Sequence, residues 1–229
     1  MKVKNSSCYR NVGETCRYCN RQCIKHGNYN GKQRYKCKSC NRTFIATYQY
    51  NACKPGISQW IQSLLKESCG IRSISRLLQI SVTTVLKRII SIAKTIRKPL
   101  PALHKTYEVD EMRIFYKSKT RKLWIVYALR TGTGQVADFA VGTRTTKTLQ
   151  RVIDTVLLSG AEKICTDKLH LYRYIIPSYI HCSKIYGTNH IERKNLNLRT
   201  HLKRLGRRTI CYSKSIAVLI ACLKIYFWS

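Results

Sequence analysis

The sequence predicts an α/β fold in its second half, preceded by two small modules. Two pairs of cysteines stand near the N-terminus, a helical hydrophobic pattern follows, and strand-like runs then alternate with helical ones. The pattern changes near Ala52 and again near Pro99, where Lys98-Pro99-Leu100-Pro101 has the composition of a short stiff linker. We therefore expect three units, which span residues 1–56, 57–98 and 99–229.

The composition indicates a polyanionic partner. The 229 residues include 43 Lys or Arg and 10 Asp or Glu, which gives a net charge of +33. Such self-repulsion is tolerated when binding to nucleic acid releases counterions, so nucleic acid is favoured over an acidic membrane surface. A structural RNA binder of the ribosomal kind is the alternative. A hydrophobic content of 44% excludes wholesale disorder.

The chain has the features of a cytoplasmic protein. Residues 1–8 carry lysines without an apolar stretch behind them, so we expect no secretory signal. The longest apolar run, Ile216 to Leu223, is far shorter than the roughly 20 residues that cross a bilayer, and it predicts a buried helix instead. Without a signal, twelve cysteines indicate reduced thiols and a metal site.

Two C-x-x-C pairs separated by seventeen residues predict a zinc ribbon. The four expected zinc ligands are Cys16, Cys19, Cys37 and Cys40. A hairpin turn is expected at 27–31, between two short strands. Cys8, Cys23 and His26 have no paired partner and are expected to be bystanders. The ribbon's role stays open between a purely structural knuckle and direct contact with DNA.

Residues 57–98 predict three short helices in a helix-turn-helix arrangement. Turns are expected at Cys69-Gly70 and Ile80-Ser81, and the third helix, which begins at Val82, is expected to read DNA. Its expected DNA-contacting residues are Ser81, Thr83, Thr84, Lys87 and Arg88. Trp60 and Val82 are expected to face the core. A helical bundle without DNA contact is the alternative, but eight Lys or Arg against Glu67 alone favour DNA.

The segment after residue 99 predicts a mixed sheet. Strands are expected at 106–116, 123–129 and 135–141, followed by a helix at 145–158 and a strand at 163–167. This order of three strands, a helix and a strand is that of an RNase-H-like core. Asp110 lies on an apolar strand face, where a carboxylate is costly unless it is paired or binds a metal. The last strand ends on Asp167, a usual place for an active-site residue.

Glu192 is the last carboxylate of the chain. On a helix, Ile191 and Leu198 would dock on the sheet, while Glu192 and Asn195 would lie on a neighbouring stripe over the two aspartates. Cations suited to successive phosphates accompany it, and these are Arg193, Arg199, Lys203, Arg207 and Arg208. For Glu192 alone, a surface ion pair is the competing interpretation.

These motifs resemble the transposases of the insertion-sequence-one family, of the InsAB type. The resemblance covers nearly the whole chain. It is carried by the ribbon ending at 33–37, the helix-turn-helix, Val109-Asp110-Glu111-Met112, Thr166-Asp167, 191–196, and Arg207-Arg208-Thr209 with its continuation through 212–215. It implies a DDE transposase whose catalytic triad falls on Asp110, Asp167 and Glu192. Many relatives carry tryptophan where this chain has Arg113, which concerns local packing beside Asp110. The family's two halves are often encoded in overlapping frames and joined by frameshifting.

The expected chemistry is metal-dependent cleavage and strand transfer of double-stranded DNA, at the element's terminal inverted repeats and in target DNA. Two magnesium or manganese ions would be held by the triad, with Asp110 bridging both. The enzyme would act as a homo-oligomer on DNA in the nucleoid of a bacterium or archaeon. Glu108, Glu111 and Glu162 are expected to be dispensable. The alternatives are a DNA-binding regulator without catalysis, which needs only residues 1–98, and an RNase-H-like nuclease.

Overall fold

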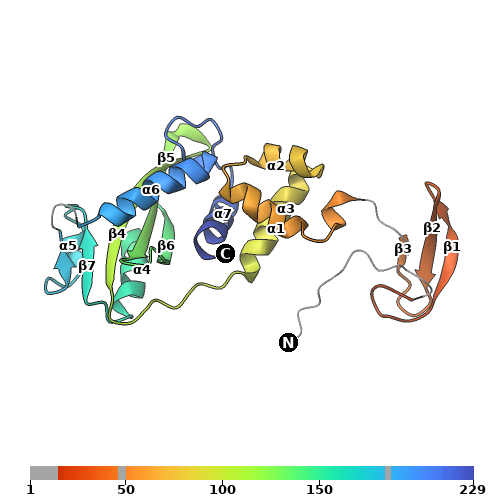
Figure 1. Ribbon diagram of the computed structural model, residues 1–229, viewed down its shortest axis with the longest axis horizontal. Coiled ribbons are helices and arrows are strands. Elements are labelled where there is room, and N and C mark those ends of the chain that lie inside the picture. Colours follow the sequence, from red (N-terminus) through yellow and green to blue (C-terminus); the bar gives the residue numbers. More distant parts are fainter. Residues whose placement is uncertain (1–14, 46–49, 184–186) are drawn as a thin grey trace.

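The computed structural model describes residues 15–45, 50–183 and 187–229. Along the chain it has a small sheet, a set of helices and a larger mixed α/β unit, in the order that the sequence predicts (Figure 1). Cys8 lies outside the described residues. No helix in the described part of the chain is long and apolar enough to span a bilayer.

The small sheet consists of β1 (Cys23–Tyr29), β2 (Lys32–Cys37) and β3 (Thr43–Ile45), antiparallel in this order. Asn30 and Gly31 join β1 to β2, and both have positive φ, as a two-residue type I′ hairpin turn requires. Phe44 is buried and its ring stacks on Tyr35 at 5.9 Å between centroids. Apart from the cysteines, the core of this module is therefore very small.

The helical segment contains η1 (Asn51–Cys53), α1 (Ile57–Lys66), α2 (Ile71–Leu78) and α3 (Val82–Thr95). The three expected helices are thus present. Two expected core positions are wrong, because Trp60 is 61% exposed and Val82 is 40% exposed. The buried stripe of α1 follows the spacing i, i+4, i+8 from Ile57, which leaves Trp60 at its solvent edge. Val82 is the first residue of α3, and the buried residues of this helix begin at Val85.

The larger sheet has five strands in the order β6-β5-β4-β7-β8. They are β4 (Thr106–Tyr116), β5 (Ser118–Arg130), β6 (Val136–Gly142), β7 (Lys163–Thr166) and β8 (His181–Cys182). The first three are antiparallel, while β7 and β8 run parallel to β4. With α4 (Thr146–Leu157) before β7, the observed order is the expected one of three strands, a helix and a strand.

The central strand β4 extends beyond its neighbour. β7 pairs with Thr106 to Val109 only, so that edge of β4 is left open from Asp110 onward, until Tyr116 meets Ser213 in an isolated bridge. α5 (Tyr172–Ile175) follows β7, and α6 (Asn189–His201) crosses the sheet beside β4 before the short η2 (Lys203–Leu205) (Figure 1). The open edge of β4 is therefore where the site is built.

The two faces of the sheet contact different elements. One face packs against α4 and α5. The other packs against α6 and against α7 (Ile216–Trp228), whose expected burial is confirmed. This second core is continuous with the buried residues of α1, α2 and α3, because α7 contacts both α1 and α3 (Figure 1). The helical segment and the sheet thus share one hydrophobic core through α7.

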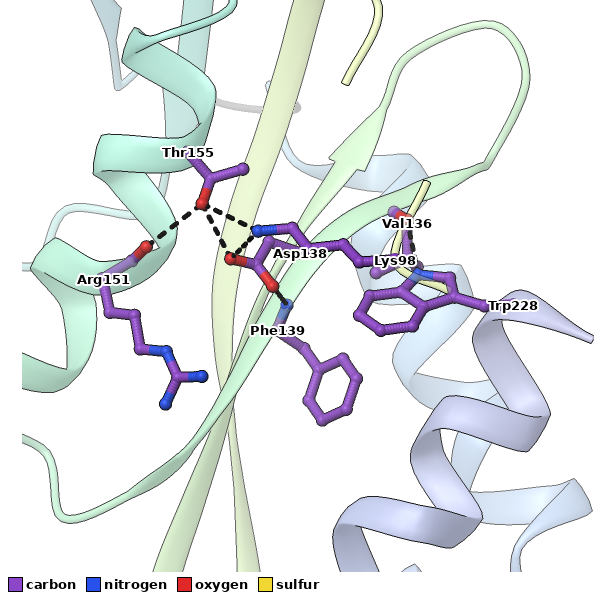
Figure 2. A network of polar contacts seen from close by, with 7 residues as sticks. All are labelled: Lys98, Val136, Asp138, Phe139, Arg151, Thr155 and Trp228. Atoms are coloured by element: carbon purple, nitrogen blue, oxygen red, sulfur yellow. Dashed lines mark hydrogen bonds and ion pairs between the residues drawn. The ribbon is translucent and has the colours of Figure 1, made fainter. Parts of the chain in front are cut away.

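Polar contacts fasten this junction (Figure 2). Lys98 Nζ lies 2.6 Å from Asp138 Oδ2 and 3.1 Å from Thr155 Oγ1, and Thr155 also donates to Asp138 at 2.8 Å. Trp228 Nε1 donates to the carbonyl of Val136 at 2.8 Å. The segment that follows α3 and the end of α7 are both tied to β6.

Candidate active site and metal centres

The four cysteines of the ribbon converge. Their sulfur atoms all lie within 4.8 Å of one another, with Cys16 and Cys40 at 3.6 Å and Cys19 and Cys37 at 3.4 Å. A tetrahedral zinc site with bonds of about 2.3 Å has sulfur separations of about 3.8 Å, so the four thiols fit that group closely. Backbone hydrogen bonds, the largest from Cys40, lower the pKa of Cys37 to about 6, which favours the thiolate that a metal needs. Cys23 lies nearby in the same small core, but outside the group of four.

Asp110, Glu111 and Asp167 form a second cluster, in which carboxylate oxygens lie within 4.8 Å of one another. Asp110 and Glu111 come from the open part of β4, and Asp167 directly follows β7. The backbone N–H of Leu169 donates to Asp167 Oδ1 at 3.0 Å, which orients that side chain. The parallel pairing of β4 with β7 therefore brings together acids that are far apart in the sequence.

Asp110 is half-buried and held by two donors. The Asn195 amide donates to Oδ2 at 2.6 Å, and the backbone N–H of Glu111 donates to Oδ1 at 2.8 Å. Asn195 in turn accepts from the Tyr127 hydroxyl at 2.9 Å. Burial, together with the charges of Glu111 and Asp167, raises the pKa of Asp110 to about 6. A cation at this cluster would relieve that repulsion, so the donor set fits a divalent metal.

Glu111 is the buried member of this cluster. It is 8% exposed, and both of its oxygens are engaged, by Arg144 Nε at 3.0 Å and by the Tyr172 hydroxyl at 3.0 Å. Burial raises its pKa, as does the charge of Asp167, while Arg144 opposes the shift. Arg144 also lies 4.7 Å over the ring of Trp124. Glu111 therefore lies within the cluster of acids, and its expected dispensability stays a prediction to be tested.

Glu192 lies in the first turn of α6, is exposed, and accepts a hydrogen bond from the Thr188 hydroxyl at 3.0 Å. It belongs to none of the ion pairs found among the described residues, which speaks against a surface salt bridge. The cluster of acids within 4.8 Å contains Glu111 instead of Glu192. Glu192 nevertheless lines the same cleft as Asp110 and Glu111.

That cleft has a volume of about 1050 Å³ and is lined by the open part of β4 on one side and by residues of α6 and of the segment up to Arg208 on the other. Acids line one part of it, apolar side chains such as Phe115 and Trp124 contribute to the walls, and four arginines also line it, which are Arg113, Arg199, Arg207 and Arg208. Arg199 donates to the carbonyls of Leu205 at 2.9 Å and Arg113 at 3.2 Å. Burial lowers the pKa of Arg199, with repulsion from Arg207 and Arg113 adding to the shift. Arginines crowded in this way suit a polyanion.

The remaining expected DNA contacts fall into two groups. Arg193 on α6 and Lys203 on η2 are exposed and lie outside the cleft lining. Because α6 ends at His201, Lys203 does not continue the helical stripe that begins at Glu192, and this part of the expectation is wrong.

On α3, Thr83 and Lys87 are exposed. Ser81 caps the helix by accepting from the backbone N–H of Thr84, whose hydroxyl also meets Tyr50. Arg88 donates to the carbonyl of Ala52 at 2.9 Å. Ser81, Thr84 and Arg88 thus have structural contacts of their own.

Three site residues escaped the sequence analysis: Tyr127, Arg144 and Tyr172. Asn195 was expected on the same helix stripe as Glu192, over the aspartates, and its amide does donate to Asp110. For Tyr127, Arg144 and Tyr172 there was no signal in the sequence, because only the folded sheet brings them to β4.

An α/β sheet with clustered carboxylates beside an arginine-lined cleft defines an enzyme class, that of metal-dependent phosphoryl transfer on nucleic acid. The comparison with known families agrees. Residues 105–227 match the model of the IS1 transposase family, and the chain belongs to that family. It is accordingly a DDE transposase, which transfers phosphoryl groups on DNA.

Curated relatives match about half of the chain. The insertion element iso-IS1n protein InsB of Shigella dysenteriae is 36% identical over 111 residues, 48% of this chain and 85% of the relative. The insertion element IS1 protein InsB of Shigella flexneri is 38% identical over 111 residues, 48% of this chain and 83% of the relative. A solved chain from a simian T-cell lymphotropic virus intasome overlaps 71% of this chain and 66% of its own, with 18% identity and a TM-score of 0.40.

Proposed function

We propose that Asp110, Asp167 and Glu192 are the catalytic, metal-binding triad of this transposase, on an RNase-H-like core. The observation that carries the proposal is the cleft, in which Glu192 of α6 and Asp110 of β4 line the same space, with Asp167 beside Asp110. Glu192 is preferred to Glu111 as the third ligand because the Arg144 guanidinium already balances the charge of Glu111, whereas Glu192 forms no ion pair among the described residues. The role of Glu111 is to place a buried negative charge beside the triad.

Magnesium or manganese held by the triad would activate water or a DNA 3′-hydroxyl and stabilise the leaving oxygen. The protein's own contribution is to orient these groups. Asn195 and the amide of Glu111 fix the two oxygens of Asp110, so that its carboxylate faces the cluster. The arginines Arg113, Arg199, Arg207 and Arg208 hold the phosphates that follow the reacting one along the cleft.

The units before the sheet supply DNA recognition in this proposal. Residues 1–56 form a zinc ribbon, 57–98 a helix-turn-helix and 99–229 the catalytic domain. Cys16, Cys19, Cys37 and Cys40 hold one zinc ion, and Thr83 and Lys87 of α3 contact the element's terminal inverted repeats. The enzyme works as a homo-oligomer that joins double-stranded element ends to target DNA. A regulator without catalysis is not favoured, since it leaves the clustered acids of the sheet without a purpose.

The test is magnesium-dependent cleavage and strand transfer by Asp110→Asn, Asp167→Asn and Glu192→Gln. These variants keep the shape of each side chain but remove its charge. Because the triad acts as one unit, each single variant should lose activity by about 1,000-fold or more, and combinations should lose little more. All three should still bind element-end DNA.

The matched control is Glu162→Gln, because Glu162 is an exposed carboxylate before β7. It should retain activity close to that of the unmodified protein. If Glu192→Gln keeps full strand transfer while Glu111→Gln loses it completely, Glu111 and not Glu192 is the third metal ligand.

A further inference from the structure

The N-terminus of α6 does not have an ordinary cap. The N-cap residue is Thr188, but its side chain makes no hydrogen bond to a backbone amide of the first turn. Its hydroxyl donates to Glu192 instead, at 3.0 Å. The first amides of a helix have no partner within the helix, and Thr188 is itself buried, so an acceptor has to come from elsewhere.

Glu108 of β4 provides that acceptor. Its Oε2 accepts from the backbone N–H of Ile191 at 2.8 Å, and its Oε1 lies 2.6 Å from Nδ1 of His190. Glu108 is 3% exposed. A buried carboxylate is costly unless it is hydrogen-bonded, and a helix N-terminus is a favourable place for a negative charge. Both oxygens of Glu108 are therefore committed to α6.

Glu108 and Asp110 are two residues apart on β4 and so lie on the same face of the sheet. They hold α6 at two points, since Glu108 binds the amide of Ile191 and Asp110 binds the side chain of Asn195. Glu192 lies between these two points along the helix. The strand that supplies one catalytic carboxylate thus also sets the height and rotation of the helix that supplies another.

We propose that Glu108 is a positioning residue, which caps α6 from the neighbouring strand and thereby holds Glu192 over the metal-binding cluster. The inference rests on the proposed triad. Glu108 is not a further metal ligand, because its oxygens are used by α6 and it is absent from the group of close acids among the described residues. Its carboxylate acts on the metal through the geometry of Glu192.

The experiment compares Glu108→Gln and Glu108→Asp in the full chain. Gln keeps an acceptor without the charge, and Asp keeps the charge with a shorter reach. Hydrogen exchange should speed up at the first-turn amides of α6, including Ile191. Mn²⁺ binding, measured by electron paramagnetic resonance without DNA, should weaken by about 10- to 100-fold, as for partners that orient metal ligands. Strand transfer should recover partly at high Mn²⁺, while zinc content and binding of end DNA stay unchanged.

Two variants serve as controls. Glu162→Gln removes an exposed carboxylate and should change neither Mn²⁺ binding nor exchange. His190→Gln removes one partner of Glu108 but leaves its bond to the Ile191 amide, and it should shift Mn²⁺ affinity less than either Glu108 variant.

Unchanged Mn²⁺ affinity in both Glu108 variants would overturn the inference. Faster exchange throughout β5 and α4, without a particular effect on α6, would also overturn it, because Glu108 would then only stabilise the fold. A separate outcome concerns the triad. If Glu192→Gln keeps full Mn²⁺ affinity and strand transfer, the proposed function fails, whatever the Glu108 variants do.

Discussion

The two candidate metal sites are assembled in different ways. In the ribbon, all four sulfur ligands come from two C-x-x-C turns of one small antiparallel sheet, and the ligands themselves make up most of its core. In the carboxylate cleft, the acids come from β4, from the end of β7 and from α6, which are positioned by a core of many residues. The ribbon should therefore depend on its metal for folding, whereas the cleft should keep its fold without metal.

The largest expected effect follows from removal of the ribbon's ligands. A Cys37→Ser, Cys40→Ser double variant should lose one zinc per chain, because only two of the four thiolate ligands remain. The ribbon should unfold as a result, since zinc binding contributes about 10–16 kcal/mol to small modules of this kind. Mass spectrometry of the native protein measures the metal. Circular dichroism should show that the sheet β4 to β8 stays folded. Zinc content equal to that of the unmodified chain would refute the assignment of these ligands.

A smaller effect is expected from Glu111→Gln. The change leaves Arg144 with a neutral partner and removes one charge beside the triad. Strand transfer should fall by about 10- to 100-fold, as is typical for groups that support metal ligands, and thus less than in Asp110→Asn. Zinc content should not change. Rates are compared at saturating Mg²⁺, and a loss as large as that of Asp110→Asn would make Glu111 a ligand.

The next effect concerns the polar contacts of Asp138, which connect the segment after α3 to β6. Asp138→Asn removes the charged partner of Lys98 and weakens the acceptor of Thr155 (Figure 2). Stability of the unit that contains the sheet should fall by about 1–3 kcal/mol, as expected for hydrogen bonds to a charged group. Urea unfolding followed by tryptophan fluorescence measures it. Asp154→Asn is the control, since Asp154 is a neighbouring exposed carboxylate on α4 that forms no ion pair among the described residues.

The smallest effect is expected on α3. Lys87→Ala should weaken binding to terminal-repeat DNA by about 1 kcal/mol and leave binding to scrambled DNA less affected. The full chain is the appropriate material, because a fragment of residues 1–98 lacks α7, which covers α3. Thr84→Ala would be ambiguous, since Thr84 also contacts Ser81 and Tyr50. If the Lys87 variant keeps the full preference of the unmodified chain for terminal-repeat over scrambled DNA, Lys87 of α3 has no part in sequence recognition.

Local patterns account for what the sequence could predict. The clustering of the four ribbon cysteines follows from their spacing alone, and the longer strands and helices from 57 onward follow from hydrophobic periodicity. The short α5 and β8 were not expected, and β5 begins five residues before the expected 123. Asp110 and Asp167 were predicted as site residues because a carboxylate on an apolar strand is costly unless it is paired or binds a metal. The roles of Glu108 and Glu111 were missed because their partners, Ile191 and Arg144, are remote in sequence and meet them only across the folded sheet. Trp60 was misplaced because aromatic residues can flank a buried stripe without entering it.

The position of α7 also has a consequence for how the protein is made. The apolar faces of α1 and α3 are covered by a helix that is synthesised only after residues 96–215 have been added. At bacterial or eukaryotic elongation rates that interval is on the order of ten seconds. During this time α1 and α3 lack part of their core, so they reach full stability only once the sheet and α7 have followed. A nascent chain that stops before α7 should therefore expose these faces to chaperones and proteases, and the second half of the chain is in this sense required for the helical segment to mature.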